Sequence, residues 1–240
     1  MYELKALVFD VDGTLADTER DGHRVAYNAA FRECGLDWHW NVEDYGRLLD
    51  VMGGKERVRH YMAVEHPDFS PPGGVEEFIG KLYVRKTRVY LELLENGEIA
   101  LRPGVARLIN EARSKGVRLG IATTSGPQNV EKLLRVSLGE ESVGWFDAVA
   151  AGDMVPRKKP APDVFELALE QLGLPADQCL ALEDTEHGLR SALDAGLKTV
   201  VTTNEYTVGQ DFSGALAVVE SLGENGPVTL EWLERLFRSV

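Results

Sequence analysis

The stretch LKALVFDVDGT, residues 4–14, decides the fold of this chain. Its apolar half indicates a buried strand of a parallel sheet, since such strands are covered on both faces. Side chains alternate along a strand, so we expect Asp10 and Asp12 to point the same way, while Gly13 lets the chain turn sharply. Open α/β sheets bind ligands at the carboxyl ends of their strands. Two carboxylates crowded there repel each other, which makes sense if a divalent cation neutralises them or if they divide into a nucleophile and an acid/base.

An ordinary turn or a calcium loop is the alternative for this pentapeptide. A calcium loop that began at Asp10 would place Thr14 at its third acidic position and Asp21 at its twelfth, with Gly13 misplaced. The calcium loop is therefore rejected. The plain turn stays open until the rest of the chain is considered.

Bulk composition narrows the class of protein. The chain has 240 residues, of which 44% are hydrophobic, as in a soluble globular protein with one large domain or two modest ones. Its net charge of −13 argues against nucleic acid or an anionic membrane as the main partner. Cys34 and Cys179 lie far apart without metal-ligand spacing, and neither a leader peptide nor a membrane-spanning run is recognisable. We expect a reduced, cytoplasmic protein that is a monomer or a weak oligomer.

Two kinds of pattern follow one another along the chain. Residues 17 to about 97 show apolar residues at helical spacing, whereas residues 100–240 alternate short apolar strands with helices. This alternation predicts βαβ units and a Rossmann-like, doubly wound parallel sheet. We predict an α/β core of residues 1–16 and 100–240 with an inserted all-helical cap domain of residues 17–99. A cap hinged beside the two acids suggests a lid, and a decorative or dimerising insertion is the alternative.

The expected core strands are residues 117–122, 146–150, 179–182 and 199–202, and the expected core helices are 105–115, 127–138, 161–172, 186–195 and 229–238. The expected cap helices are residues 23–31, 42–52, 57–64 and 75–94.

Polar residues follow two further core strands. Thr123, Thr124 and Ser125 precede a helix, where hydroxyls and free N–H groups suit a phosphate, although a helix N-cap is the common alternative. Lys159 stands before Pro160, which restrains it into extended geometry and makes it a fixed cation for a phosphoryl group. A solvated basic loop is the alternative there.

Glu183 and Asp184 end another buried strand. Asp184 could complete a Mg²⁺ site with Asp10 and the backbone carbonyl of Asp12, because Mg²⁺ prefers few carboxylates together with waters and a phosphate oxygen. Glu183 would bind the metal directly or through a water. A helix N-cap is the alternative for Asp184.

The order Asp-x-Asp-Gly-Thr, Thr, Lys-Pro, Glu-Asp resembles the haloacid dehalogenase (HAD) superfamily of phosphotransferases over essentially the whole chain. The resemblance implies a Mg²⁺-dependent phosphatase in which Asp10 attacks phosphorus and becomes an aspartyl phosphate. Asp12 would protonate the leaving oxygen and then activate water, while Thr123 and Lys159 hold the phosphoryl oxygens. The metal ligands that it implies are Asp10, Asp12 through its carbonyl, Asp184 and, in support, Glu183.

The helical insertion looks like the cap of the subgroup that contains phosphoglycolate phosphatase and β-phosphoglucomutase. Within this subgroup the stretches WHW (38–40), GGKER (53–57), GEIALRPG (97–104) and AGDM (151–154) are similar to CbbY-like phosphatases, whose characterised members hydrolyse xylulose 1,5-bisphosphate. The resemblance implies a phosphorylated sugar as the small-molecule partner. The substrate-binding residues that it suggests are Thr18, His23, Lys55 and Lys86 from the cap, with solvated lysines as the alternative, and Thr124 and Ser125 from the core.

Two positions depart from the β-phosphoglucomutase pattern. A histidine expected four residues beyond Thr18 is replaced by Gly22, and His23 lies one step further on, so that one inserted residue in 19–22 would restore the match. A lysine after the second core motif is replaced by Gly126, which favours a phosphatase over a phosphomutase. A phosphoglycolate-type phosphatase and a non-catalytic phospho-acceptor, such as a receiver domain, also stay open.

Overall fold

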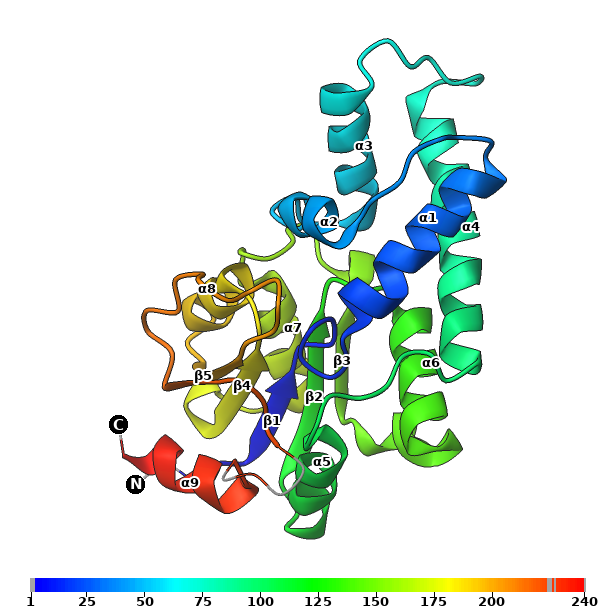
Figure 1. Cartoon of the computed structure of the whole chain (residues 1–240). Coiled ribbons are helices and arrows are strands. Elements are labelled where there is room, and N and C mark those ends of the chain that lie inside the picture. Colours follow the sequence, from blue (N-terminus) through cyan, green and yellow to red (C-terminus); the bar gives the residue numbers. More distant parts are fainter. Residues whose placement is uncertain (1–2, 224–225, 227, 240) are drawn as a thin grey trace. The chain divides into compact units, whose positions relative to one another are not determined.

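The apolar stretch after Lys5 forms the central strand of a parallel sheet. The computed structural model describes residues 3–223, 226 and 228–239. Within them the strands pair in the order β3-β2-β1-β4-β5-β6, with β1 between β2 and β4 (Figure 1). The chain thus builds the sheet outward from β1 in both directions, which makes the end of β1 a topological switch point. The strands are β1 (Ala6–Phe9), β2 (Arg118–Thr123), β3 (Ala148–Ala151), β4 (Cys179–Glu183), β5 (Lys198–Thr202) and β6 (Ala217–Val219).

Helices cover both faces of this sheet. Ala6 and Val8 pack in one cluster with side chains of α7 (Asp163–Leu172) and α8 (Glu186–Asp194), while Leu7 and Phe9 point to the opposite face and are equally buried. A strand covered on both sides explains the uninterrupted apolar run. The helices are α5 (Val105–Ser114), α6 (Pro127–Leu138), α7 (Asp163–Leu172), α8 (Glu186–Asp194) and α9 (Leu230–Arg238), with 3-10 turns at Glu140–Trp145, Gly152–Met154 and Ala176–Gln178.

The doubly wound α/β core is confirmed, and its predicted helices and strands begin and end within two residues of the expected positions. Strand β6 was not expected, because three partly exposed residues show no pattern that distinguishes a strand from a loop. It pairs with β5 at the edge of the sheet after the loop of residues 203–216.

The chain divides into two compact units, residues 1–17 with 100–240 and residues 18–99. The predicted boundary differs by one residue, since Asp17 belongs to the core, where its carboxylate lies 3.3 Å from Nε of Arg102. Among the residues that the structure describes, no helix combines the length and apolar character needed to cross a bilayer.

The second unit contains only helices and loops among its residues 18–99. A π-helical turn, η1 (Glu19–His23), runs directly into α1 (Arg24–Glu33). Helix α2 (Val42–Leu48) stops four residues before its expected end, at Leu48, whose carbonyl accepts a hydrogen bond of 3.1 Å from Nε of Arg57. The remaining helices are α3 (Gly54–Glu65) and α4 (Val75–Glu95).

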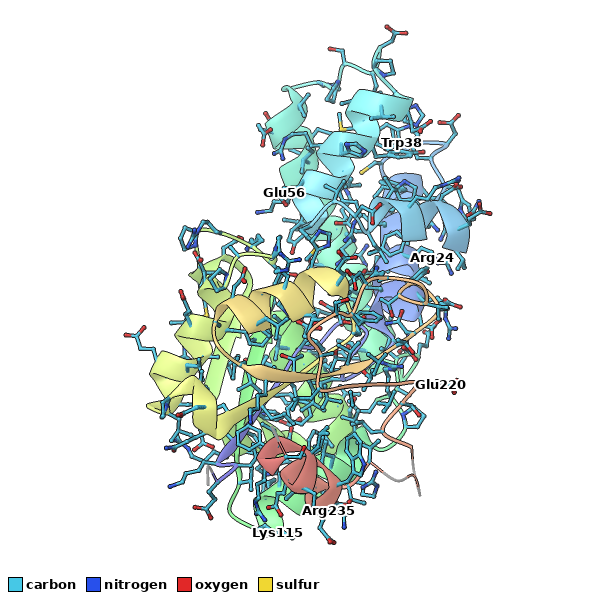
Figure 2. All side chains as sticks on the ribbon, turned by 90° about the vertical axis from the view of Figure 1, so that its left-hand side faces the viewer. Arg24, Trp38, Glu56, Lys115, Glu220 and Arg235 are labelled. Carbon is cyan, nitrogen blue, oxygen red and sulfur yellow. The ribbon has the colours of Figure 1, made fainter. Side chains whose placement is uncertain are left out.

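Aromatic rings form the interior of this helical unit. Trp40 is 0% exposed, and its ring centroid lies 4.8 Å from those of Tyr27 and Phe31. Trp38, labelled in Figure 2, stacks on His66 at 4.6 Å. The Trp38–Trp40 segment has no secondary structure, so no helix turn or strand among the described residues pairs with the backbone of Trp40. The side-chain amide of Asn28 pairs with it instead: it donates to the carbonyl of Trp40 and accepts from its N–H, both at 2.8 Å.

Replacing Asn28 with alanine should destabilise the helical unit by about 2–4 kcal/mol. The buried N–H of Trp40 loses its partner, which costs about 1–3 kcal/mol, and its carbonyl keeps only the longer hydrogen bond of 3.3 Å from Arg24. Urea unfolding followed by tryptophan fluorescence measures this loss. Asn41→Ala is the control: its exposed side chain caps α2 by accepting from Asp44 N–H at 2.8 Å, so about 1 kcal/mol is expected. A loss for Asn28→Ala no larger than that control would contradict the assignment.

Candidate active site

Strand register brings the sequence motifs to one edge of the sheet. Phe9, the last residue of β1, pairs with Ile121 of β2 and Leu182 of β4. The next residue, Asp10, donates its N–H to the carbonyl of Leu182 at 2.9 Å. Because β2 continues to Thr123 and β4 to Glu183, the polar residues after all three strands lie at the same carboxyl edge.

Lys159 has all three of its ammonium protons engaged at this edge. Its Nζ donates to Oδ1 of Asp10 at 2.5 Å, to Oε1 of Glu183 at 2.6 Å and to the carbonyl of Ala122 at 2.9 Å. The ring of Phe165 lies beneath it, with its centroid 5.0 Å from Nζ. An ammonium has three donors, so these contacts define its position completely. The alternative of a solvated basic loop does not hold for Lys159, which is buried.

Burial and charge set the ionisation of this group. Burial raises the pKa of Asp10, and repulsion from Glu183 and Asp12 adds to it against the attraction of Lys159. Burial also raises the pKa of Asp184, reinforced by Asp10 and Glu183. For Lys159 burial opposes the charged form, but the attraction of the two carboxylates outweighs it and raises the pKa of the ammonium. Burial and mutual repulsion thus both disfavour the ionised forms of Asp10 and Asp184, even with Lys159 beside them.

Three buried carboxylates could hold a metal ion. Asp10, Glu183 and Asp184 each offer an oxygen, and these oxygens all lie within 4.8 Å of one another. Oxygen donors of this kind suit a hard divalent cation such as Mg²⁺, and a cation would offset the repulsion that raises the pKa of Asp10 and Asp184. Asp12 is half-buried, and the predicted metal site uses only its backbone carbonyl.

Glu183 is held by both of its oxygens. Oε1 accepts from Lys159, and Oε2 accepts from the N–H of Asp184 at 3.0 Å. Its carboxyl group occupies the place of a side chain at Gly188 on α8, where a Cβ would lie 2.0–2.2 Å from three of its atoms. Glu183 thus positions Lys159 in this structure, and its predicted contact with a metal would be in addition to these bonds.

Asp184 is oriented by residues that sequence reasoning did not assign. Thr14 Oγ1 donates to its Oδ1 at 3.3 Å, and Nδ2 of Asn204 donates to its Oδ2 at 2.7 Å. Gly13, at φ +87°, approaches so closely that a Cβ would lie 2.1 Å from Oδ2. The sequence signal for Thr14 is that it ends the first motif. The only sequence signal for Asn204 is that it lies just after the strand β5.

The hydroxyl residues after β2 lie in the turn before α6. Thr123 is buried at the end of the strand, and its Oγ1 accepts the N–H of Ser125 at 3.1 Å. Ser125 is buried and Thr124 half-buried. The hydroxyl of Thr123 therefore closes the turn before α6, and its proton stays available to donate. Phosphate binding by these three residues stays a prediction.

In the helical unit the structure brings the predicted cap residues together. Nζ of Lys86 lies 2.8 Å from Nδ1 of His23, and Lys86 is only 3% exposed. The solvated alternative therefore fails for Lys86, but it fits Lys55, which is exposed. Both ammonium groups lie over the ring of Tyr83, at 5.1 Å for Lys55 and 5.8 Å for Lys86. Thr18 is fully buried, one residue before η1.

The π-helical turn gives a physical reason for the displaced histidine. A π-turn is the form a helix takes when it accommodates an extra residue, which fits the one-residue insertion inferred in 19–22. At Gly22 a Cβ would lie 2.6 Å from Ile99 and 2.7 Å from the ring of Tyr90, so no larger residue fits there. His23 is buried beside the same ring, with centroids 4.3 Å apart.

Comparisons with known proteins point in one direction. The family model described as haloacid dehalogenase-like hydrolase matches residues 4–196. The plasmid protein CbbY of Cupriavidus necator is 49% identical over 92% of this chain and 87% of its own length. A phosphorylated carbohydrates phosphatase of Thermotoga maritima is 30% identical over 91% of each chain.

A solved structure agrees in both fold and sequence. Mutant CbbY from Rhodobacter sphaeroides in complex with xylulose 1,5-bisphosphate is 43% identical, with a TM-score of 0.87 over 96% of this chain and 99% of that one. The predicted fold class and the resemblance are confirmed by these matches. The chain thus belongs to the haloacid dehalogenase-like hydrolases, in their CbbY-like group, and is a phosphoric monoester hydrolase.

Proposed function

We propose that the chain is a Mg²⁺-dependent phosphatase of sugar phosphates that works through an aspartyl phosphate on Asp10, with xylulose 1,5-bisphosphate as its substrate. The main support is the buried contact of Asp10 with Lys159 beside two further carboxylates at the switch point of the sheet. A carboxylate, a fixed cation and a set of oxygen ligands are the groups that phosphoryl transfer requires.

The proposed reaction proceeds in two displacements. A carboxylate oxygen of Asp10 forms a bond to phosphorus, the bond from phosphorus to the sugar oxygen breaks, and Asp12 gives its proton to that oxygen. Water then attacks the aspartyl phosphate, Asp12 takes the proton of the water, and inorganic phosphate leaves with Asp10 restored. Thr123 and Lys159 would hold the phosphoryl oxygens while charge develops on them, and Lys159 would exchange one of its present acceptors for a phosphoryl oxygen.

Asp10, the carbonyl of Asp12 and Asp184 are the proposed ligands of Mg²⁺, with Glu183 in support. When bound, the ion supplies positive charge that offsets the repulsion between the carboxylates and the phosphoryl group. Asn204 and Thr14 already orient Asp184 for this role.

The substrate is inferred from the relatives and from the cap residues. A CbbY structure contains xylulose 1,5-bisphosphate, and another relative is named for phosphorylated carbohydrates. Lys55, Lys86 and His23 are the proposed ligands of the second phosphate or the sugar, together with Thr18, Thr124 and Ser125. A β-phosphoglucomutase-like phosphomutase would instead isomerise a sugar phosphate when given a bisphosphate activator, and a phosphoglycolate-type phosphatase would prefer phosphoglycolate.

Phosphate release from a panel of substrates tests the reaction and the nucleophile together. We expect Mg²⁺-dependent release, fastest from xylulose 1,5-bisphosphate and slower from ribulose 1,5-bisphosphate, phosphoglycolate and β-glucose 1-phosphate. Asp10→Asn should lower kcat by roughly 10⁴-fold or more, since the amide is nearly isosteric but not nucleophilic. The exposed Asp211→Asn is the control and should retain full activity. Appreciable turnover by clean Asp10→Asn protein would remove Asp10 from the nucleophile role.

Metal binding should appear in thermal stability as well as in activity. The raised pKa of Asp184 means that its contribution to stability is fully present below the unfolded pKa, about 3.9, and is lost as the pH rises through the folded value. Asp184→Asn should therefore raise Tm in chelator at neutral pH, with a gain that shrinks towards pH 4. Mg²⁺ should raise the Tm of the unmodified protein and have little effect on this variant.

Asp194→Asn, on an exposed position of α8, is the matched control and should follow the unmodified protein at every pH. Equal Mg²⁺-induced shifts in Asp184→Asn and the unmodified protein would remove Asp184 from the metal site.

Lys55→Ala should raise KM for xylulose 1,5-bisphosphate about tenfold with little change in kcat, because a charged hydrogen bond to a remote phosphate contributes to binding alone. KM for a monophosphate should not change. The control is Lys81→Ala, an exposed lysine of α4 that pairs with Glu77 at 2.5 Å. An unaltered KM for the bisphosphate would return Lys55 to a solvated role.

A further inference from the structure

Arg102 is a buried arginine that binds three separate segments of the core. Its side chain is 7% exposed and comes just after the point where the chain re-enters this unit. The backbone N–H of Arg102 also donates to the carbonyl of Leu15 at 2.8 Å. Its guanidinium donates to the carbonyl of Gly13 and pairs with the carboxylate of Asp17 at 3.3 Å. It also donates to the carbonyl of Thr202 at 3.2 Å and to Oγ1 of the same residue at 3.0 Å. Two further carbonyls accept from it, that of Thr203 at 2.5 Å and that of Glu220 at 3.1 Å.

These partners lie at the same edge of the sheet as the active-site residues. Thr202 ends β5, and Glu220, labelled in Figure 2, follows β6 directly. Gly13 belongs to the turn after β1 that carries Asp12. One planar guanidinium thus ties the turn to the ends of two strands, which a flexible lysine could not do with the same geometry.

The peptide groups of Gly13 are held from both sides. Its N–H donates to the carbonyl of Ala16 at 2.8 Å, and its carbonyl accepts from Arg102 and, at 3.5 Å, from Asn204. Asn204 in turn donates to Asp184 at 2.7 Å. At φ +87° Gly13 adopts a conformation that glycine reaches easily, so these bonds select one orientation for each of the two peptides that flank it, the first of which follows Asp12 directly.

We propose that Arg102 is a positioning residue that, through the Gly13 carbonyl, holds the turn so that the carboxyl group of Asp12 can protonate the leaving oxygen. The inference rests on the proposed function, in which Asp12 is the general acid. Arg102 does not touch the reacting atoms; it acts by limiting the orientations open to its neighbour in the turn.

The leaving group separates this role from a merely structural one. An alkoxide needs a proton as it departs, whereas p-nitrophenolate is stable enough to leave without one. The ratio of kcat/KM for an alkyl phosphate to that for p-nitrophenyl phosphate therefore reports on the general acid. Because kcat/KM covers only the steps up to phosphoryl transfer, the later action of Asp12 on water does not enter the ratio. A general loss of folded protein lowers both values equally.

The experiment compares Arg102→Met with Arg107→Met in the whole chain with Mg²⁺. Arg107 is the matched control, because it also donates to three backbone carbonyls, but these belong to Leu222, Gly223 and Val228 and not to the turn after β1. The alkyl substrate is the sugar phosphate with the highest kcat/KM, which we expect to be xylulose 1,5-bisphosphate.

We expect Arg102→Met to lower the alkyl-to-aryl ratio about tenfold or more, a part of the 10²–10⁴-fold that general acid catalysis contributes, while Arg107→Met leaves the ratio unchanged. If Arg102→Met does not fold, Arg102→Gln, which retains one amide donor, replaces it with the same expected direction. An equal loss on both substrates, or the same change of ratio in Arg107→Met, would overturn the proposal. Absence of phosphate release by the unmodified protein would instead refute the proposed function.

Discussion

The proposed active site depends on one ammonium group that is shared among three acceptors. Lys159 lies between the carboxylates of Asp10 and Glu183 and the carbonyl of Ala122, and its hydrogen bonds join β1, β2 and β4 at their carboxyl ends. One cation cannot neutralise three buried acids. A metal ion would supply the missing positive charge, favour the ionised carboxylates and bind a phosphate in turn.

Close approach is the second constraint on this edge of the sheet. Gly13 and Gly188 stand where a methyl group would collide with the carboxyl groups of Asp184 and Glu183. The two glycines therefore let buried acids lie against backbone, where N–H and hydroxyl donors can orient them. Asn204 completes the arrangement from the loop after β5, and Arg102 from the segment that leads into α5, so the site is assembled from parts that are far apart along the chain.

The sequence predicted the site residues that lie next to recognisable strands and helices, and it missed the residues that reach the site from loops. Asp10, Lys159 and Asp184 each follow or precede a recognisable element, so the topology alone brings them together. Arg102 and Asn204 are separated from the turn at Gly13 by 89 and 191 positions, and an arginine or asparagine in a loop carries no periodic signal. The sequence indicated the π-helical turn only as one inserted residue relative to the β-phosphoglucomutase pattern. Sequence spacing does not distinguish an insertion in a helix from one in a loop.

At Gly188 the residue that would best stabilise the helix differs from the residue that the proposed active site needs. Glycine inside a helix costs roughly 1 kcal/mol relative to alanine, so any procedure that optimises helix propensity would replace it. In α8 that exchange would direct a methyl group into the carboxyl group of Glu183 and displace the partner that locates Lys159. If Lys159 acts as proposed, a more stable helix would then belong to a poorer catalyst, and thermostabilisation of this protein should leave Gly188 unchanged.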